Sequence, residues 1–154
     1  MKKFFLSGIL VFFLDRISKW IVVKKLSFGT VIKVFPFFNL IRNENKGIAF
    51  GLFQGISGKF FFNILVLVVL VIIAVEGIKV AKRESCGLES ISFGLILGGG
   101  MSNLIDRFFY GKVVDFLDLH LGAYHWPAFN IADAGVTIGF ILLIIGCLRG
   151  KRCF

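Results

Sequence analysis

Residues 98–133 read GGGMSNLIDRFFYGKVVDFLDLHLGAYHWPAFNIAD and place several ionisable side chains in a chain that is otherwise rich in apolar residues. Among them are the carboxylates of Asp106, Asp115 and Asp133. An ionisable side chain at membrane depth is costly, and one that faces the interior of a helix bundle generally has a function. We therefore place the candidate site in this stretch.

The composition is that of a membrane protein. The chain has 154 residues, of which 57% are hydrophobic, so it has room for one domain covering residues 1–154, and neither a repeat nor a linker divides it. Its formal net charge of +9 is spread over small basic clusters between apolar runs. Because such clusters favour anionic lipid headgroups, we expect membrane lipid and no nucleic acid as a partner.

The apolar stretches that predict transmembrane helices are residues 4–23, 60–75, 88–105 and 133–148. A helix of about 20 residues crosses a hydrocarbon core of about 30 Å. The first stretch begins like a secretory signal peptide, but no small-residue cleavage site follows Leu14, and the chain continues with charged residues before becoming apolar again. We therefore predict an all-α membrane protein with four transmembrane helices.

Residues 24–58 are too mixed to cross a membrane and include the strand-like segment TVIKVFPFFNLI at 30–41. Pro36 within it indicates an edge strand or a break. We expect a small β-rich extracytoplasmic cradle whose phenylalanines reach the lipid interface, namely Phe35, Phe37, Phe38, Phe50 and Phe53. Asn45 and Gly47 indicate a turn, although the Asn45 amide could instead bind an extended peptide.

Four spans place both termini on one side of the membrane. The basic clusters on that side, which mark it as cytoplasmic, are Lys2 and Lys3, then Lys79, Lys82 and Arg83, and finally Arg149, Lys151 and Arg152. The β-rich cradle then faces outward. So does a second long loop, residues 110–128, with Tyr124 and Trp126 as anchors at the lipid interface.

Two groups of polar residues lie within the predicted spans. Asp15 and Lys19 are four residues apart and share a helix face, so they could form an ion pair that only stabilises the bundle or could brace a site. Asn103 and Asp106 also share a face, and the neighbouring Arg107 could neutralise a carboxylate or bind a loop carbonyl. A polar helix end at the membrane interface would also explain the second group.

Asp115 and Asp133 are expected at the same membrane face, because the third and fourth spans are antiparallel and joined on the outer side. Two carboxylates close together in a poorly solvated place cannot both ionise cheaply, so they share one proton. The ionised carboxylate can then take a proton from water while the protonated one donates to a carbonyl oxygen. This hydrolysis needs neither a nucleophilic serine nor a metal, and composition alone does not exclude Asp106 from the pair.

Other functions fit the sequence less well. A serine nucleophile would require Ser18 or Ser102 to meet a lysine at the outer face, and Ser102 does not lie in a nucleophile turn. A transporter could use Asp15, Asp106 and Asp133 as a proton relay, but the ionisable residues gather near one face. A purely structural membrane scaffold leaves the carboxylates unexplained.

Neither a disulfide framework nor a metal motif is indicated. The cysteines are Cys86, Cys147 and Cys153. They form no CxxC pair and no ligand cluster with histidine, so we expect them to have no structural role. His120 and His125 share a loop with Asp118, but their spacing matches no helical ligand pair, which favours a solvated loop over a metal site.

These motifs resemble those of the lipoprotein signal peptidases, the type II signal peptidases of bacterial inner or cytoplasmic membranes. The resemblance runs from DRISK at Asp15 through NKGIAFG at Asn45 and GGGMSNLIDRFFYGKVVDF to FNIAD at Asp133, and so covers nearly the whole chain. It implies an aspartic endopeptidase that cleaves the signal peptide from diacylglyceryl-modified prolipoproteins just before the lipidated cysteine. It also implies that no metal and no cofactor take part.

The resemblance makes Asp115 and Asp133 the catalytic pair. It assigns support of the site or substrate binding to Asp15, Lys19, Asn45, Asn103, Asp106, Arg107 and Asn130. For Asp15 and Lys19 this favours the functional interpretation. Arg16 stands where the family commonly has Gln, and Ser102 where it commonly has Gly, which concerns local packing rather than the chemistry.

Overall fold

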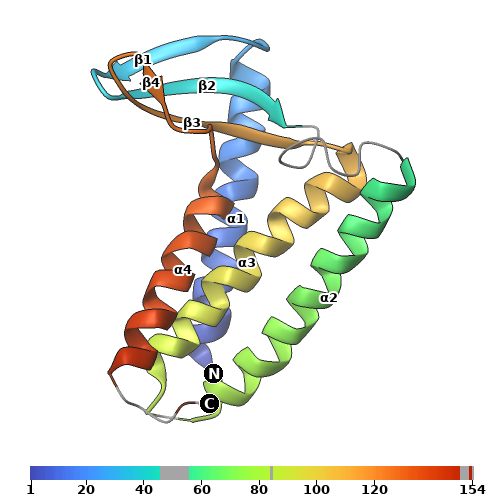
Figure 1. Ribbon diagram of the computed structural model, residues 1–154, viewed down its shortest axis with the longest axis vertical. Helices are drawn as coiled ribbons and strands as arrows, with labels where there is room; N and C mark the ends of the chain where they lie inside the picture. Colours follow the sequence, from blue (N-terminus) through green and yellow to red (C-terminus); the bar gives the residue numbers. More distant parts are fainter. Residues whose placement is uncertain (46–55, 84, 150–152, 154) are drawn as a thin grey trace.

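The computed structural model describes residues 1–45, 56–83, 85–149 and 153 of the chain. Its elements are α1 (Lys2–Lys25), β1 (Val31–Phe35), β2 (Phe38–Asn45), α2 (Ile56–Ala81), α3 (Gly87–Tyr110), β3 (Val113–Leu121), β4 (Tyr124–His125) and α4 (Ile131–Leu148). The helices run side by side, and the strands form a sheet across one end of them, while the N-terminus lies at the other end (Figure 1).

Three of the helices are long and apolar enough to cross a membrane: Phe60–Ala81, Gly87–Tyr110 and Ile131–Leu148. They correspond to the predicted spans at 60–75, 88–105 and 133–148. The protein is therefore membrane-embedded, and many of its apolar side chains point outward, as a lipid environment requires; Phe60 is 63% exposed and Ile72 57% exposed. The first predicted span is a continuous helix too, α1, but it carries more charge than those three.

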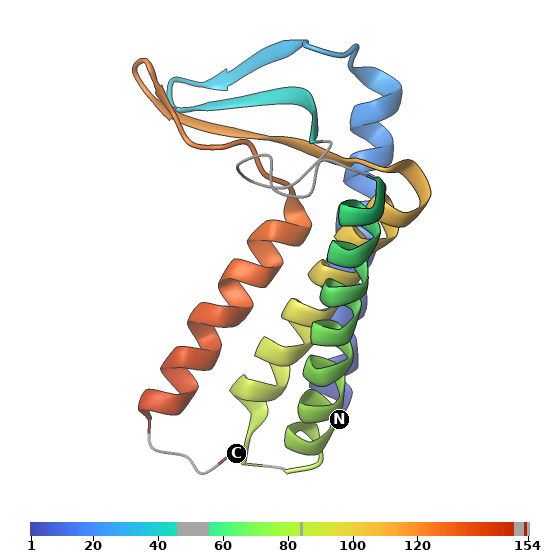
Figure 2. The same cartoon turned by 45° about the vertical axis from the view of Figure 1, so that its right-hand side comes forward.

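α3 lies at the centre of the helical body and packs against α1, α2 and α4 (Figures 1 and 2). Glycines allow these close contacts. A Cβ added at Gly98 would lie 2.2 Å from the backbone oxygen of Gly8 on α1, and one added at Gly99 would lie 2.4 Å from that of Ala132 on α4. The small residues of α3 therefore bring the polar segments of three helices together, as glycines commonly do in membrane bundles.

The sheet has the order β1-β2-β3-β4, and its neighbouring strands are antiparallel. β1 ends at Phe35 and β2 begins at Phe38, so Pro36 lies in the hairpin turn and confirms the predicted break. The interpretation of residues 110–128 as a long loop is wrong, since most of them form β3 and β4. β3 pairs with β2, and this pairing aligns Asp115 with Asn43.

Polar contacts fix the sheet to the end of α1. The Arg42 guanidinium donates to the backbone oxygens of Val23 at 3.0 Å and Leu26 at 2.9 Å. It also pairs with Glu44, which in turn contacts Lys112 at the start of the segment leading into β3. Asn45 is the last residue of β2 and not part of a turn, whereas Gly47, Phe50 and Phe53 lie outside the described residues.

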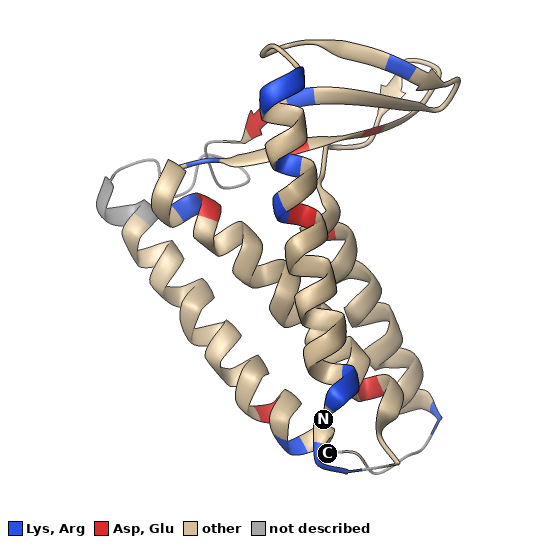
Figure 3. Ribbon diagram, turned by 180° about the vertical axis from the view of Figure 1, so that it is seen from behind, with Lys and Arg blue, Asp and Glu red and all other residues tan. Residues whose placement is uncertain are grey.

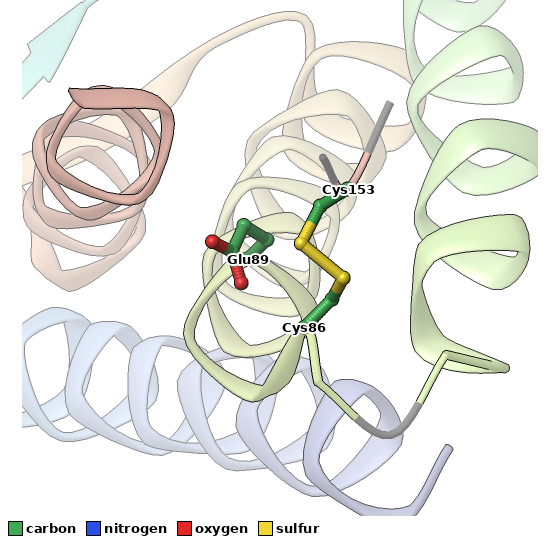
Figure 4. Close-up of side chains that lie close together, drawn as sticks. All are labelled: Cys86, Glu89 and Cys153. Carbon is green, nitrogen blue, oxygen red and sulfur yellow. A yellow bond between two sulfur atoms is a disulfide. The ribbon is translucent and has the colours of Figure 1, made fainter. Parts of the chain in front are cut away.

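The expectation that the cysteines have no structural role is wrong for two of them. Cys86 and Cys153 form a disulfide, although their sequence separation is 67 residues. It joins the start of α3 to the segment that follows α4, beside the side chain of Glu89 (Figure 4). Sequence spacing could not reveal this pair, because only the packing of the helices brings the two cysteines together. Cys147 is a free, exposed thiol.

Candidate active site

The structure brings Asp115 and Asp133 to the same place, where β3 passes over the beginning of α4. Asp115 is only 3% exposed, while Asp133 is partly buried in the first turn of α4. Asn130 contacts both carboxylates. Its side-chain amide donates to Asp115 Oδ1 at 2.7 Å, and its backbone N–H donates to Asp133 Oδ2 at 3.1 Å. A single residue thus bridges the two predicted catalytic aspartates.

Asn130 can do this because it is the N-cap of α4. Its side-chain oxygen accepts a hydrogen bond from the Asp133 N–H at 2.9 Å, and the Asp133 carboxylate accepts one from the Asn130 N–H, so the two residues form a capping box. The box satisfies amides that a helix start leaves without partners. It also fixes the orientation of the Asp133 carboxylate relative to the helix.

Two further asparagines donate hydrogen bonds to the two carboxylate oxygens of the pair that Asn130 does not contact. Asn103 on α3 donates to Asp133 Oδ1 at 2.8 Å, and Asn45 on β2 donates to Asp115 Oδ2 at 3.2 Å. Asn103 also accepts hydrogen bonds, from Lys19 at 2.8 Å and from Asn130 at 3.2 Å. The two carboxylates are therefore positioned by amides from three separate elements, which fixes both side chains.

Beneath the pair lies a buried ionic cluster. Lys19 is 4% exposed, and its ammonium group lies 2.6 Å from Asp15 Oδ2 and 2.8 Å from Asp106 Oδ2. Asp15 is fully buried and accepts a hydrogen bond from the Ala132 N–H at the start of α4, at 2.9 Å. The predicted pairing of Asp15 with Lys19 is confirmed, and Asp15 links α1 to α4 directly below Asp133.

Both residues at which the chain departs from the resembled family belong to this cluster. Ser102 donates to Asp15 Oδ2 at 2.7 Å, and Arg16 forms an ion pair with Asp106. They were assigned to local packing, not to the site. Their side chains offered a signal that could have assigned both residues to the site. Buried charges require polar partners, and a hydroxyl or a guanidinium can be the partner of a buried carboxylate. Figure 3 shows acidic and basic residues of α1 and α3 near the end that bears the sheet.

Arg107 lies at the edge of the cluster. Its guanidinium is 5.8 Å from the centre of the Phe62 ring on α2 and interacts electrostatically with Asp133, Asp115 and Asp106. It therefore adds positive charge next to the carboxylates, as the sequence suggested. Of the residues predicted to support the site, three asparagines contact the aspartate pair, and the charged residues lie in the ionic cluster beneath it or at its edge.

The surroundings of Asp115 favour its protonated form. Burial raises the pKa of Asp115 to about 6, and the negative charge of Asp133 acts in the same direction. Hydrogen bonds from Asn45 and Asn130 and the charge of Lys19 oppose the shift without cancelling it. Burial and a neighbouring carboxylate are the two influences that keep one proton on an acidic pair.

An apolar pocket of about 540 Å³ includes Asp133 in its lining. Its walls come from the segment before α4 and from the outer face of α4, including Trp126, Phe129, Thr137 and Ile138. A pocket with apolar walls and one carboxylate in its lining can receive an extended, largely apolar chain and place one polar bond next to Asp133.

The predicted loop containing His120 and His125 is instead part of the sheet. The two rings stack at 4.8 Å, and His125 Nδ1 lies 2.8 Å from Asp118 Oδ1. Burial alone would raise the pKa of Asp118, but hydrogen bonds from Asn39 and His125 outweigh it and lower that pKa. Within the described part of the chain, the potential metal ligands that converge are Cys86, Glu89 and Cys153, and there the disulfide removes both thiolates.

Comparison with known proteins identifies a family. The model of the family described as signal peptidase (SPase) II matches residues 8–149. A lipoprotein signal peptidase of Thermodesulfovibrio yellowstonii is 37% identical over 144 residues, covering 94% of this chain and 93% of the relative. One of Burkholderia thailandensis is 41% identical over 148 residues, covering 94% and 87%.

Solved structures show the same likeness. A bacterial membrane enzyme determined by the in meso method at 1.9 Å resolution superposes with a TM-score of 0.84 at 30% identity, over 98% of this chain and 96% of that one. A second, determined at 2.3 Å, gives a TM-score of 0.77 at 30% identity, over 99% and 91%.

Proposed function

The chain belongs to the signal peptidase II family, and we propose that it cleaves the signal peptide from diacylglyceryl-modified prolipoproteins just before the lipidated cysteine, with Asp115 and Asp133 as the catalytic pair. It is an aspartic endopeptidase of the membrane. The observation that carries the assignment of the pair is their shared partner: Asn130 hydrogen-bonds to both carboxylates. These are the only two carboxylates of the described residues that this N-cap residue joins.

The pair performs the hydrolysis by sharing one proton. Asp133, as carboxylate, takes a proton from a water molecule located between the two side chains, and the resulting hydroxide attacks the scissile carbonyl carbon. Asp115, protonated, donates its proton to the carbonyl oxygen as charge develops there. When the tetrahedral intermediate breaks down, the amine of the lipidated cysteine leaves with the proton that Asp133 acquired, and Asp115 recovers its own from the hydroxyl.

The other site residues position this pair. Asn130, Asn103 and Asn45 each donate to one of the carboxylates, and so fix which oxygen faces the water and which faces the carbonyl. Lys19 places positive charge below them through Asn103. We assign Asp15, Asp106 and Arg107 to the ionic support of the helices that carry the site.

The substrate lies in the membrane with its lipid chains in the hydrocarbon. The pocket that Asp133 helps to line lies between α4 and the residues before it, and its apolar wall suits a signal peptide entering from the lipid side. The β-rich cradle, ending in Asn45, covers the pair from the other side. We expect the scissile bond to lie at the junction of the apolar pocket and the polar cluster.

We propose one domain, residues 1–154, with α1 as the fourth membrane-spanning helix. Its buried charges are neutralised by partners inside the bundle, which reduces the cost of placing them at membrane depth. Both termini are then cytoplasmic and the sheet extracytoplasmic in the bacterial inner membrane. The basic residues at the helix ends opposite the sheet support this orientation.

Replacement of each aspartate tests the assignment. We expect Asp115→Asn and Asp133→Asn each to lower the rate of cleavage of a lipid-modified precursor peptide by at least about a hundredfold, because either change removes an acid–base group. The measurement is turnover by the purified protein in detergent without an ion gradient. A proton-relay carrier would not cut the peptide under these conditions.

Asp118→Asn is the matched control for Asp115→Asn. Asp118 is a second buried aspartate on β3, but it pairs with Asn39 and His125 and not with Asn130. We expect this variant to retain most of the activity. Near-normal turnover by either Asp115→Asn or Asp133→Asn would disprove the catalytic pair.

A further inference from the structure

A second polar pocket lies at the end of the helices opposite the sheet. It has a volume of about 490 Å³ and lies where the N-terminus, the end of α2 and the start of α3 meet. Its lining includes Met1, Lys3, Lys82, Gly87 and Ser90. We propose that this pocket binds a phosphate group, carried by an anionic membrane lipid or present as free phosphate.

The start of α3 forms part of the wall of this pocket. The helix begins at Gly87, and its N-cap, Cys86, makes no side-chain capping bond because its sulfur is in the disulfide. The amides of the first turn of an α-helix have no acceptor within the helix, and the helix start carries partial positive charge. Such a start binds phosphate well when other donors converge on it.

Ser90 is the first independent sign that a ligand binds there. It is 3% exposed and lines the pocket, and its hydroxyl has no hydrogen-bond partner within the described part of the chain. A buried hydroxyl without a partner is costly, and native structures rarely leave one in this state. A phosphate oxygen in the pocket would provide the acceptor that Ser90 lacks.

The charge around the pocket is also positive. The Lys3 ammonium group lies at the start of α3, 2.8 Å from where a Cβ on Gly87 would be. Lys82 and the N-terminal amine lie on the same rim, and the amine donates to the backbone oxygen of Ala81 at 2.7 Å. Figure 3 shows basic residues from α1 and from the end of α2 gathered at this end.

The acidic residue of the first turn of α3 does not compete for this site. Glu89 is 2% exposed and is absent from the pocket lining. Its carboxylate instead faces α4, where Oε1 would lie 2.6 Å from a Cβ added at Gly146 (Figure 4). The described residues that line the pocket are therefore neutral or basic, which suits a group with one or two negative charges.

Lipid retention by the full-length protein tests the proposal. The protein is purified in detergent, offered phosphatidylglycerol or phosphatidylcholine, and analysed by native mass spectrometry for bound lipid. We expect Ser90→Ala and Lys3→Gln each to lower the affinity for phosphatidylglycerol about fivefold to tenfold, because each removes a donor to a charged group. Lys25→Gln, which removes the same charge from the opposite end of α1, is the matched control and should bind normally.

Inorganic phosphate identifies the source of the group. If phosphate alone raises the unfolding temperature of the wild type and does so less for both variants, free phosphate is a ligand; if only phosphatidylglycerol binds, the ligand is the lipid headgroup. Peptide cleavage by Ser90→Ala serves as the folding control, since removing an unpartnered hydroxyl should not destabilise the protein. Unchanged binding of both probes by both variants, or no binding of either probe by the wild type, would overturn the proposal.

Discussion

The charges of individual residues favour one bound proton at the aspartate pair. The aspartate pair, the ionic cluster beneath it and Arg107 at the cluster's edge together contribute seven charged side chains: the carboxylates of Asp15, Asp106, Asp115 and Asp133 and the cations of Arg16, Lys19 and Arg107. Four carboxylates and three cations leave one negative charge, so one bound proton makes the group neutral. A poorly solvated environment favours the neutral state, because an uncompensated buried charge is costly. Asp115 is suited to bind that proton, since its pKa is raised to about 6.

The pH dependence of cleavage should reflect this proton. As pH rises through about 6, Asp115 of the substrate-free enzyme ionises and the pair loses its proton donor. We therefore expect kcat/KM to fall. At lower pH, protonation of the second carboxylate removes the base, so the profile should be bell-shaped. The measurement is kcat/KM for a lipidated peptide between pH 4 and 9. If kcat/KM does not fall between pH 6 and pH 9, the pair does not depend on a shared proton.

The two tasks of Asn130 can be separated by substitution. Ser is also a good N-cap residue, so Asn130→Ser should preserve the start of α4, but its hydroxyl cannot reproduce the amide that bridges Asp115 and Asn103. We expect kcat to fall about tenfold or more, with KM and unfolding temperature nearly unchanged. Asn130→Ala should lose the same activity and also about 1 kcal/mol of stability with the cap.

The comparison of these two variants tests the positioning role. If both variants retain kcat and only Asn130→Ala loses stability, then Asn130 acts only as a helix cap. A shift of the alkaline limb in Asn130→Ser would support the bridge, because loss of a hydrogen bond to ionised Asp115 should raise the pKa of that carboxyl further.

At the scale of elements, the site depends on how closely α1 approaches α3. A Cβ on Gly98 would lie 2.2 Å from the backbone oxygen of Gly8, so Gly98→Ala must move one helix. The hydrogen bond between Ser102 and Asp15 crosses the same interface one turn further along α3. We expect Gly98→Ala to lower stability by about 1–3 kcal/mol and to lower cleavage as well. Thermal unfolding and turnover of the purified variant provide the measurement.

Gly100→Ala is the control for this prediction. A Cβ there would meet the Cδ2 atom of Leu70 at 2.5 Å, which is the end of a side chain that can change its rotamer. Its effect should be clearly smaller than that of Gly98→Ala. Equal stability of the two variants would show that the contact between α1 and α3 can relax without cost.

Sequence patterns predicted the elements unequally well. The apolar runs located α2, α3 and α4, since lipid-facing helices need continuous apolar residues, and spacing alone predicted the pairing of Asp15 with Lys19. β3 was missed, although Leu117, Leu119 and Leu121 alternate with polar residues in the period of a strand.

Pairing between distant elements was harder to predict. The convergence of Asp115 and Asp133 followed from the antiparallel connection of two helices, but Asn130 as their bridge required the cap geometry, which only coordinates provide. The disulfide was missed for a related reason, because it depends on the fold placing Cys153 next to Cys86 at the start of α3.

At the scale of the whole molecule, α3 connects two ends with different properties. At one end it carries Asn103 to the aspartate pair under the sheet and Asp106 to the ionic cluster beneath that pair. At the other end it begins at the disulfide and lines the basic pocket. Because the two ends are separated by the length of one helix, changes at the disulfide should affect the stability of the bundle and leave the chemistry of the pair intact.

This separation predicts the effect of breaking the disulfide. Cys86–Cys153 closes a long loop, with a sequence separation of 67 residues, so its loss should lower the free energy of unfolding by about 2–4 kcal/mol. We expect Cys153→Ser, or treatment of the wild type with a phosphine reductant, to lower the unfolding temperature while kcat at low temperature stays unchanged. Cys147→Ser should alter neither quantity, since that thiol is free and exposed. Alkylation of all three cysteines in the unreduced, denatured protein would show that the bond does not form.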